Sequence, residues 1–258
     1  MYMPAMPAFQ PESSVVADVV PSPTHDERQN GRQPDIILLH YTGMQNAEEA
    51  LSRLCTPESK VSAHYFVFED GRIAQSVPES RRAWHAGESH WAGETDINSA
   101  SIGIEIANPG HDFGYPDFPP RQIAAVTALC RGIIARRGIN PRRVLAHSDV
   151  APSRKQDPGE KFPWRRLADS GVGEWVTPSR ISDKGPIFAL GDESDGVRGL
   201  QLALADFGYG VPVTGIFDKM TFDVVTAFQR HFRPAKIDGI ADGSTLRTLH
   251  KLLERRRW

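Results

Sequence analysis

Strand-like and helix-like hydrophobic patterns alternate along residues 35–175 of this chain. The segment from Asp35 to His40 holds four consecutive large apolar residues before its histidine, which is typical of a buried β-strand. Residues 120–138 instead carry an apolar stripe at helical spacing between an initial proline and a final glycine, which predicts a long helix. Because interleaved strands and helices pack in layers around one sheet, we expect an α/β domain with a mixed central sheet flanked by helices.

Shorter segments complete this predicted domain. A β-hairpin is expected over residues 64–76, because Asp70-Gly71 supplies the positive φ angles of a type I′ turn. Further strands are predicted at residues 101–106 and 143–147, and a further helix at residues 46–55.

An internal repeat marks a second unit after residue 190. The block Gly-Ile-Phe-Asp at 215–218 recurs as Gly-Ile-Ala-Asp at 239–242, and each copy precedes an amphipathic segment. An aspartate directly before a helix accepts hydrogen bonds from the free backbone N–H groups of the first turn. With a third helix around residues 196–207, the region 191–258 is predicted to be a small all-α three-helix domain, and residues 176–190 a linker.

Residues 1–34 fit neither unit. They contain six prolines, and their longest apolar patch, Val15 to Val20, is interrupted by Asp18. This composition predicts an extended or disordered N-terminal arm. The first basic residue is Arg28, so no conventional signal peptide is visible in the sequence.

The overall composition is that of an ordinary globular protein, with 40% hydrophobic and 24% charged residues. A net charge of −2 argues against binding to nucleic acid, which requires a basic surface. No apolar run approaches the roughly 18 residues that a membrane span requires. Cys55 and Cys130 occupy apolar helical positions, which favours buried free thiols and leaves a disulfide as the alternative.

Two histidines stand at the ends of predicted strands, where open sites usually form. These are His40 and His147, and Asp157 follows ten residues after the second. Two imidazoles and a carboxylate are sufficient to hold a catalytic zinc ion that keeps its fourth position open. A histidine at a strand end is also often a hydrogen-bonded packing residue, so spacing alone leaves that alternative open.

Six sequence blocks occur in order along residues 35–175. The blocks are His40-Tyr41-Thr42, Ser62-Ala63-His64-Tyr65, Ala83-Trp84-His85-Ala86-Gly87, Ser101-Ile102-Gly103-Ile104-Glu105, Ala146-His147-Ser148-Asp149 and Lys155-Gln156-Asp157-Pro158-Gly159. Together they resemble the zinc-dependent N-acetylmuramoyl-L-alanine amidases, a family related to phage lysozyme-type amidases and animal peptidoglycan recognition proteins. The resemblance implies the fold of that family and hydrolysis of the amide between N-acetylmuramic acid and L-alanine.

By this resemblance, His40, His147 and Asp157 match the ligands of one zinc ion per chain. Glu105 matches the carboxylate near the metal-bound water, and Lys155 matches the active-site cation. Zinc lowers the pKa of bound water to roughly 7, and Glu105 would move the proton to the leaving amine. Zinc and Lys155 would stabilise the oxyanion. Without the resemblance, the favoured interpretation of Glu105 is a solvent-facing strand residue, and that of Lys155 is an ordinary loop lysine.

Four further residues are candidates for substrate contact. The resemblance suggests that His64 and His85 face the cleft near Trp84, where a sugar or stem peptide would lie. Packing against the sheet is the alternative for His64, and capping of a backbone carbonyl is the alternative for His85. Asn108 is a candidate for binding a peptide carbonyl, although shaping the turn at 107–110 is the favoured role.

Residues 190–253 resemble the three-helix peptidoglycan-binding domain that is often attached to wall hydrolases. The Leu200-Gln201 and Phe228-Gln229 pairs and the repeated Gly-Ile-x-Asp block carry this resemblance. We therefore expect a bacterial, monomeric amidase that acts on peptidoglycan or muropeptides, in the cytoplasm or in the periplasm and cell envelope. The alternatives are a non-catalytic peptidoglycan receptor, a metallopeptidase that cuts within the stem peptide, and a structural wall anchor.

Overall fold

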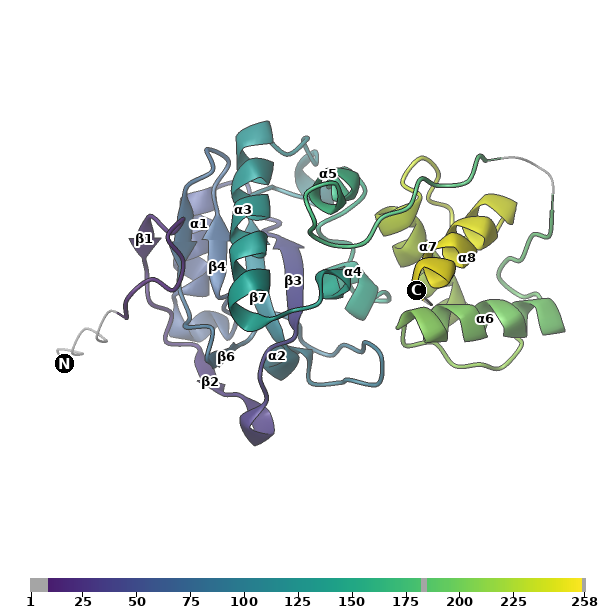
Figure 1. The fold of residues 1–258 in the computed structure, drawn as a ribbon, viewed down its shortest axis with the longest axis horizontal. Coiled ribbons are helices and arrows are strands. Elements are labelled where there is room, and N and C mark those ends of the chain that lie inside the picture. Colours follow the sequence, from purple (N-terminus) through teal and green to yellow (C-terminus); the bar gives the residue numbers. More distant parts are fainter. Residues whose placement is uncertain (1–8, 182–184, 257–258) are drawn as a thin grey trace.

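A six-stranded sheet forms the centre of the larger domain in the computed structural model, which describes residues 9–181 and 185–256 (Figure 1). The strands lie in the order β1-β5-β4-β7-β3-β8. β3 pairs in parallel with β7 and β8, whereas β4 and β5 form the predicted antiparallel hairpin. These pairings confirm the predicted mixed sheet. The strands are β1 (Asp18–Val19), β3 (Ile36–Tyr41), β4 (Tyr65–Val67), β5 (Ile73–Gln75), β7 (Ser101–Ile106) and β8 (Val144–Ala146).

β3 is the strand on which the site depends. Its residues Ile36 to Leu39 are fully buried, because helices cover both faces of the sheet and a parallel central strand is apolar on both sides. The register of β3 against β7 pairs Leu38 with Gly103 and His40 with Glu105. Two polar residues therefore lie side by side at the carboxyl ends of adjacent strands.

Two helices cover opposite faces of the sheet (Figure 1). α3 (Pro120–Arg137) packs Val126, Leu129 and neighbouring apolar residues against the face that carries Tyr65. α1 (Ala47–Leu54) packs against the face that carries Phe66. Successive residues of a strand point to opposite faces of the sheet. Tyr65 and Phe66, which are neighbours on β4, therefore belong to two different apolar layers, one on each side of the sheet.

The shorter elements connect this core. The helices are α2 (Ile97–Ala100), α4 (His147–Val150) and α5 (Trp164–Ala168), with 3₁₀ turns at Gln29–Gly31, Pro57–Ser59, His111–Phe113 and Pro141–Arg143. Cys130 is buried in the α3 layer and Cys55 is half-buried, and both are free thiols. None of the helices described here is long and apolar enough to cross a membrane.

The N-terminal segment differs from the prediction of an extended or disordered arm. Its described part, residues 9–34, packs on the larger domain: β1 pairs in parallel with β5, and β2 (His25–Glu27) pairs with β6 (Arg81–Ala83). Arg28 is buried and donates hydrogen bonds to the carbonyl oxygens of Glu79, Ser99 and Ser101. The prediction missed this packing because backbone pairing and one buried arginine, rather than an apolar stripe, hold the segment.

The C-terminal domain contains α6 (Asp195–Phe207), α7 (Lys219–Phe232) and α8 (Gly243–Arg256), as the sequence repeat predicts. Asp218 caps α7 by accepting a hydrogen bond from the Thr221 backbone at 2.8 Å, and Asp242 makes the same bond to Thr245. Gln201 donates to the carbonyl of residue 216 at 2.8 Å and accepts from the N–H of residue 215. Gln229 repeats this arrangement at 240 and 239, so both repeated blocks are structural.

The two domains share a packed interface. Trp91, in a loop of the larger domain, packs edge-on against Tyr209, and the N–H of Ala92 donates to the carbonyl of Gly208 at 2.8 Å. Arg256 forms an ion pair with Glu174 at 2.8 Å. Residues 176–181 of the predicted linker run along α8, where Ser244 donates to the carbonyl of Ser179, and residues 182–184 lie outside the described part.

Candidate metal centre and active-site cleft

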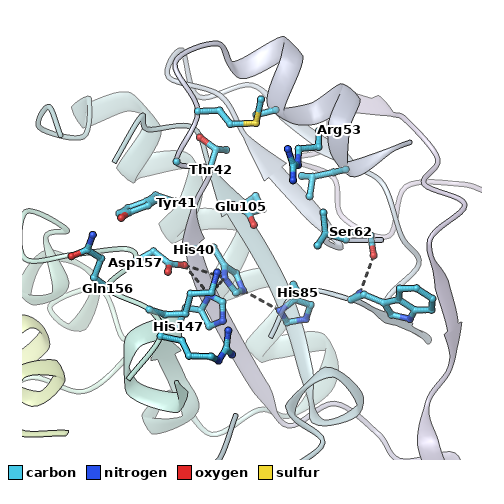
Figure 2. A pocket seen from close by; sticks show the side chains of 18 of the residues that line it. His40, Tyr41, Thr42, Arg53, Ser62, His85, Glu105, His147, Gln156 and Asp157 are labelled. Atoms are coloured by element: carbon cyan, nitrogen blue, oxygen red, sulfur yellow. Dashed lines mark hydrogen bonds and ion pairs between the residues drawn. The ribbon is translucent and has the colours of Figure 1, made fainter. Parts of the chain in front are cut away.

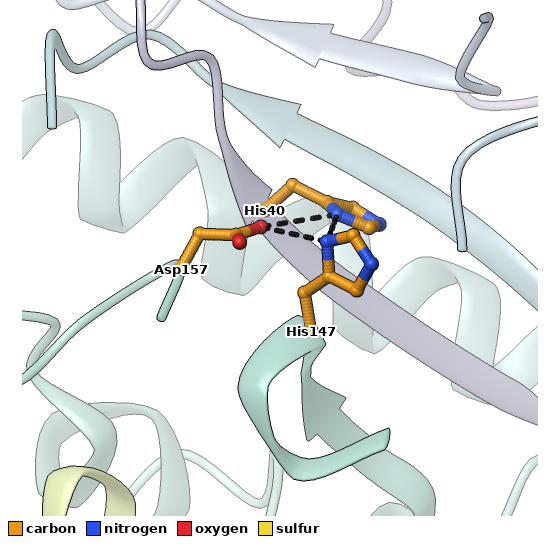
Figure 3. Close-up of side chains that lie close together, drawn as sticks. All are labelled: His40, His147 and Asp157. Carbon is orange, nitrogen blue, oxygen red and sulfur yellow. Dashed lines mark hydrogen bonds and ion pairs between the residues drawn. The ribbon is translucent and has the colours of Figure 1, made fainter. Parts of the chain in front are cut away.

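Three side chains that the sequence predicts as metal ligands converge at the carboxyl end of the parallel strands (Figure 3). His40 lies in β3, His147 begins α4 directly after β8, and Asp157 lies in the loop beyond α4. Neighbouring parallel strands end at the same edge of a sheet, which is where open α/β sheets place their sites. The three residues are buried, with exposed fractions of 2%, 2% and 6%.

The facing atoms of these side chains are close enough to share one ion. His40 Nδ1 lies 2.9 Å from His147 Nδ1, and Asp157 Oδ2 lies 3.2 Å from the first nitrogen and 3.0 Å from the second. Ligand atoms about 2.0 Å from a tetrahedral zinc ion are about 3.3 Å apart, so these separations suit an ion of that size.

The outer nitrogen of His147 fixes the tautomer of this ring. Nε2 lies 3.0 Å from the carbonyl oxygen of Ala86, which can only accept, so Nε2 donates and Nδ1 keeps its lone pair. That lone pair points at a carboxylate oxygen of Asp157 and at His40 Nδ1. His40 Nδ1 keeps its own lone pair, because the Ser101 hydroxyl donates to the carbonyl of Ile97, so His85 Nε2 donates to Ser101 and His85 Nδ1 accepts from His40 Nε2. Such electron-rich atoms repel one another at this range unless a cation lies between them. The donor set therefore fits a divalent metal ion.

The protonation states that the site favours are those that a metal requires. Burial and the neighbouring His147 lower the pKa of His40 to about 4, which keeps this imidazole neutral at physiological pH. Burial by itself raises the pKa of Asp157, but His147 and His40 outweigh it and hold this pKa well below the usual range. Neutral imidazole and ionised carboxylate are the ligand forms of these side chains.

His85 supports His40 from the side away from the proposed ion. Its Nδ1 lies 3.0 Å from His40 Nε2, and its Nε2 lies 3.3 Å from the hydroxyl of Ser101. Burial lowers the pKa of His85 well below its usual value, and the neighbouring His40 lowers it further. His85 thus lines the cleft, and its two ring nitrogens are occupied by His40 and by the hydroxyl of Ser101.

Glu105 lies beside the three converging side chains (Figure 2). Its Oε2 is buried and has no hydrogen-bond partner among the described residues. Burial raises the pKa of Glu105 well above the usual value, the nearby Asp157 raises it further, and Lys155 opposes this shift. A raised pKa makes a carboxyl group better able to accept and then to donate a proton, which suits general acid–base catalysis. The alternative of a solvent-exposed strand residue does not fit this environment.

A cavity of about 510 Å³ opens above this group. Its walls include His40, His147, Asp157 and Glu105, together with Lys155, Trp84 and His85 from the predicted site. A volume of this size is in the range of small-ligand sites, and it is enough for a sugar residue with part of a peptide. The cleft therefore brings together seven of the nine predicted site residues.

His64 lies outside the cleft, which corrects the expectation that it faces the substrate. It is fully buried; its Nδ1 accepts a hydrogen bond from the Gly103 N–H at 2.9 Å, and its Nε2 lies 3.0 Å from the carbonyl of Arg81. Burial and the adjacent Arg28 lower its pKa to about 3. His64 is therefore a neutral packing residue that joins the N-terminal segment to the sheet.

Asn108 also lies outside the cleft walls, and its contacts are those of a turn residue. Its Oδ1 accepts a hydrogen bond from the N–H of Gly110 at 2.9 Å, and its Nδ2 donates to the carbonyl of Pro116 at 3.0 Å. The side chain is thus occupied within its own loop, which matches the favoured alternative for this residue.

Two arginines of the cleft wall were not predicted. Arg154 donates a hydrogen bond to the carbonyl oxygen of Ala86 at 3.0 Å, the same oxygen that orients His147. Its position next to Lys155 in a matching block was the available signal. Arg53 reaches the cleft from the last turn of α1 (Figure 2), and an exposed arginine in an amphipathic helix carries no signal of its own.

Comparisons with known proteins agree with this geometry. Residues 30–160 match the family model described as N-acetylmuramoyl-L-alanine amidase, and residues 193–249 match a model described as a putative peptidoglycan binding domain. The curated N-acetylmuramoyl-L-alanine amidase AmiD of Escherichia coli K12 is 39% identical over 233 residues, which cover 85% of this chain and 82% of AmiD.

Solved structures resemble both domains together. The complex of E. coli AmiD with the substrate anhydro-N-acetylmuramic acid-L-Ala-D-γ-Glu-L-Lys has a TM-score of 0.74 and 36% identity, covering 88% of this chain and 91% of that chain. AmpDH3 from Pseudomonas aeruginosa in complex with an anhydromuramic pentapeptide has a TM-score of 0.73 and 31% identity, covering 88% and 94%.

The family model spans half of this chain, and the similarity to AmiD extends through both domains. Each of the six blocks that suggested the family from sequence alone contributes at least one residue to the walls of this cleft. The chain belongs to the N-acetylmuramoyl-L-alanine amidase family.

Proposed function

We propose that this chain uses one Zn²⁺ ion to hydrolyse the amide bond between N-acetylmuramic acid and L-alanine in peptidoglycan or in muropeptides. Membership of the amidase family gives the class of reaction. The observation that carries the proposal is the position of Glu105, whose buried Oε2 atom has no hydrogen-bond partner among the described residues, beside three converging side chains that can bind a metal. A structural ion pair would leave no such carboxyl group unpaired at the bottom of a cavity.

We assign the metal to His40, His147 and Asp157. A zinc ion held there would act as a Lewis acid on the scissile carbonyl and would lower the pKa of water to roughly 7. Three protein ligands that line a cavity match the ligand number of catalytic rather than structural zinc sites, in which a fourth position would be left for water. His85 and the carbonyl of Ala86 hold the two imidazoles in the required orientation.

Glu105 and Lys155 have separate roles in the proposed reaction, proton transfer and charge stabilisation. Glu105 accepts a proton from the attacking water and passes it to the amino nitrogen of L-alanine as the carbon–nitrogen bond breaks. The products are a free carboxylate on the muramic acid and a peptide with a free amino terminus. Lys155 lines the same cavity, and its ammonium group stabilises the negative charge that develops on the carbonyl oxygen.

Trp84 and the C-terminal domain bind substrate in this proposal. The half-buried indole of Trp84 offers an aromatic surface on the cleft wall to the sugar or the peptide. The C-terminal domain, which matches a peptidoglycan-binding model, holds the chain on the polymer and raises the local substrate concentration. We propose that the protein acts as a monomer.

Digestion of two substrates tests the proposal. Purified sacculi and a soluble anhydromuramyl peptide are incubated with the protein, with and without a chelator, and the products are analysed by mass spectrometry. We expect peptides with a free L-alanine amino terminus, no release with the chelator, and recovery after zinc is restored. Cleavage within the peptide would indicate a metallopeptidase, and binding to sacculi without cleavage would indicate a receptor. The faster substrate shows whether polymer or fragments are preferred.

A further inference from the structure

Asp149 connects the two domains beside a proposed metal ligand. It is the third residue of α4, a helix whose first residue is His147, and it is 1% exposed. Its Oδ2 accepts a hydrogen bond from the backbone N–H of Ala146 at 2.9 Å, which closes the first turn of α4. The position of His147 therefore depends on where the Asp149 carboxylate is held.

Two side chains of the C-terminal domain hold that carboxylate. The hydroxyl of Tyr209 donates to Asp149 Oδ1 at 2.7 Å, and Nδ1 of His231 lies 2.7 Å from Oδ2. Tyr209 and His231 are only 1% and 2% exposed. The imidazole of His231 is stacked on Trp164 of the larger domain, with centroids 3.7 Å apart, and on Phe232, with centroids 3.8 Å apart. Stacking on both sides leaves the donor nitrogen little freedom to turn away.

The same interface supports the second contact that orients His147. The loop that supplies the Ala86 carbonyl continues to His90, whose N–H donates to the carbonyl of Val150 in α4 at 2.8 Å. The next residue is Trp91, which packs against Tyr209 at a centroid distance of 5.0 Å. The two elements that orient the His147 ring, α4 and the loop that carries Ala86, thus both contact the C-terminal domain. α4 lies on the side of the larger domain that faces the C-terminal domain (Figure 1).

We propose that Tyr209 and His231 are positioning residues of the metal centre, acting through Asp149 to hold His147 in place. The C-terminal domain is then a part of the active-site scaffold as well as a module for binding peptidoglycan. This inference goes beyond the proposed function and rests on it in one respect, the assignment of His147 as a metal ligand. A buried carboxylate that loses a donor shifts toward other partners, and α4 shifts with it. Partners beyond the ligands themselves typically change metal affinity 10- to 100-fold.

Conservative substitutions in the full chain distinguish a positioning role of Tyr209 and His231 from a role in packing the interface. Tyr209→Phe and His231→Phe each remove one donor to Asp149 and keep an aromatic ring at the interface. His231→Asn keeps a nitrogen donor close to the place of Nδ1 and serves as the rescue variant. Arg256→Gln is the matched control, because it removes the 2.8 Å ion pair to Glu174 across the same interface. The other described contacts of Arg256 are with the carbonyl and the ring of Phe207, and none of its described hydrogen bonds or ion pairs reaches α4.

Metal binding is the primary readout. Zinc affinity is measured on the metal-free proteins by competition with a chromophoric chelator, and the visible absorption of the Co²⁺-loaded proteins reports ligand geometry. We expect the two Phe variants to bind zinc about ten-fold more weakly, with an altered Co²⁺ spectrum and a lower kcat at unchanged KM. His231→Asn should recover most of the affinity, and Arg256→Gln should bind like the wild type even if its urea midpoint falls.

Three results would overturn the inference in different ways. If the wild type binds one zinc ion and both Phe variants match its affinity and spectrum, Asp149 serves only to join the domains and the positioning role is wrong. If the wild type itself binds no zinc, the proposed metal site fails and the inference fails with it. A loss of affinity in Arg256→Gln equal to that in the Phe variants would indicate general loosening of the interface and would also contradict the inference.

Discussion

Glu105 and His40 are register partners on the adjacent parallel strands β7 and β3. A pair of residues in this relation is held at a fixed separation by the backbone hydrogen bonds of the ladder, so the acid–base group and a metal ligand cannot drift apart independently. Phe66 on β4 flanks Glu105 on its other side. The sheet thus provides the rigidity that a catalytic arrangement needs, and the loops supply the remaining groups.

Glu105→Gln is expected to keep the fold and the metal while it removes the proton acceptor. Turnover of an anhydromuramyl peptide should fall by about 10²- to 10⁴-fold, the usual size of a general acid–base contribution. Metal content after dialysis should remain one zinc ion per chain. The matched control is Glu58→Gln, an exposed carboxyl group outside the cleft. Near-normal turnover in the Glu105 variant would remove this residue from the mechanism.

Asp157→Ala is expected to lose the metal. The remaining pair of imidazoles supplies no negative charge, and three protein ligands are the usual minimum for a catalytic zinc ion. Zinc content measured by atomic emission should drop to background and activity should fall with it, whereas Asp169→Asn, an exposed carboxyl group, should retain both. Stoichiometric zinc in the Ala variant would show that Asp157 is not a ligand.

Gly103→Ala is expected to disturb the metal centre through His85. A Cβ atom at this position would lie 2.5 Å from the His85 ring, which in turn contacts His40 Nε2. The ring must move, and overpacking of this kind typically costs about 1–3 kcal/mol of folding stability. We expect weaker zinc binding and a lower urea midpoint.

Gly199→Ala in α6 is the control for that substitution, because a Cβ atom there meets nothing within 4 Å. It should stabilise the protein by up to about 1 kcal/mol, since alanine favours helices over glycine. Zinc affinity of Gly103→Ala equal to that of the wild type would contradict the role of His85 in holding His40.

The stability of the metal-free protein is expected to fall as the pH drops from 7 to 5. The folded pKa of His64 is about 3, against 6.5 for an ordinary histidine, because burial and Arg28 disfavour its charged form. Between these two values the unfolded chain binds a proton that the folded chain does not, so stability rises with pH across this window. His64 alone should contribute about 2 kcal/mol of the difference between pH 7 and pH 5.

Urea unfolding of the metal-free wild type and of His64→Gln at both pH values measures this contribution. His40 and His85, whose pKa values are also lowered, add to the total slope in both proteins. The difference between the two slopes therefore reports His64 together with its effect on the pKa of the neighbouring His85. Equal slopes in wild type and variant would show that His64 does not titrate as described.

The convergence of His40, His147 and Asp157 could be predicted in part from their local sequence and in part from the resemblance to the amidase family. His40 and His147 each follow a short apolar strand, and Asp157 lies in a loop with a distinctive Asp-Pro-Gly sequence. The helical repeat was equally visible, since Asp218 and Asp242 cap helices through bonds to residues three positions later. The zinc ion, the monomeric state and the cellular compartment stay predictions.

The features that sequence reasoning missed are held by contacts between distant parts of the chain. The buried ring of His64 lies 3.1 Å from the guanidinium group of Arg28, which lies 36 positions earlier. Asp149 contacts Tyr209 and His231, which lie 60 and 82 positions later. No local periodicity encodes such contacts, because each depends on how separately predicted elements pack together.

The pairing of β1 with β5 has a practical consequence for any shortened form of this protein. A fragment that begins at residue 35, where the apolar pattern starts, would leave the Ile73 and Gln75 carbonyls without the Ala17 and Val20 N–H groups that donate to them. It would also remove Arg28 from the carbonyls of Ser99 and Ser101. β5 would then be an open edge able to pair with the same strand of another molecule. The N-terminal segment thus covers the edge of β5 and disfavours edge-to-edge aggregation.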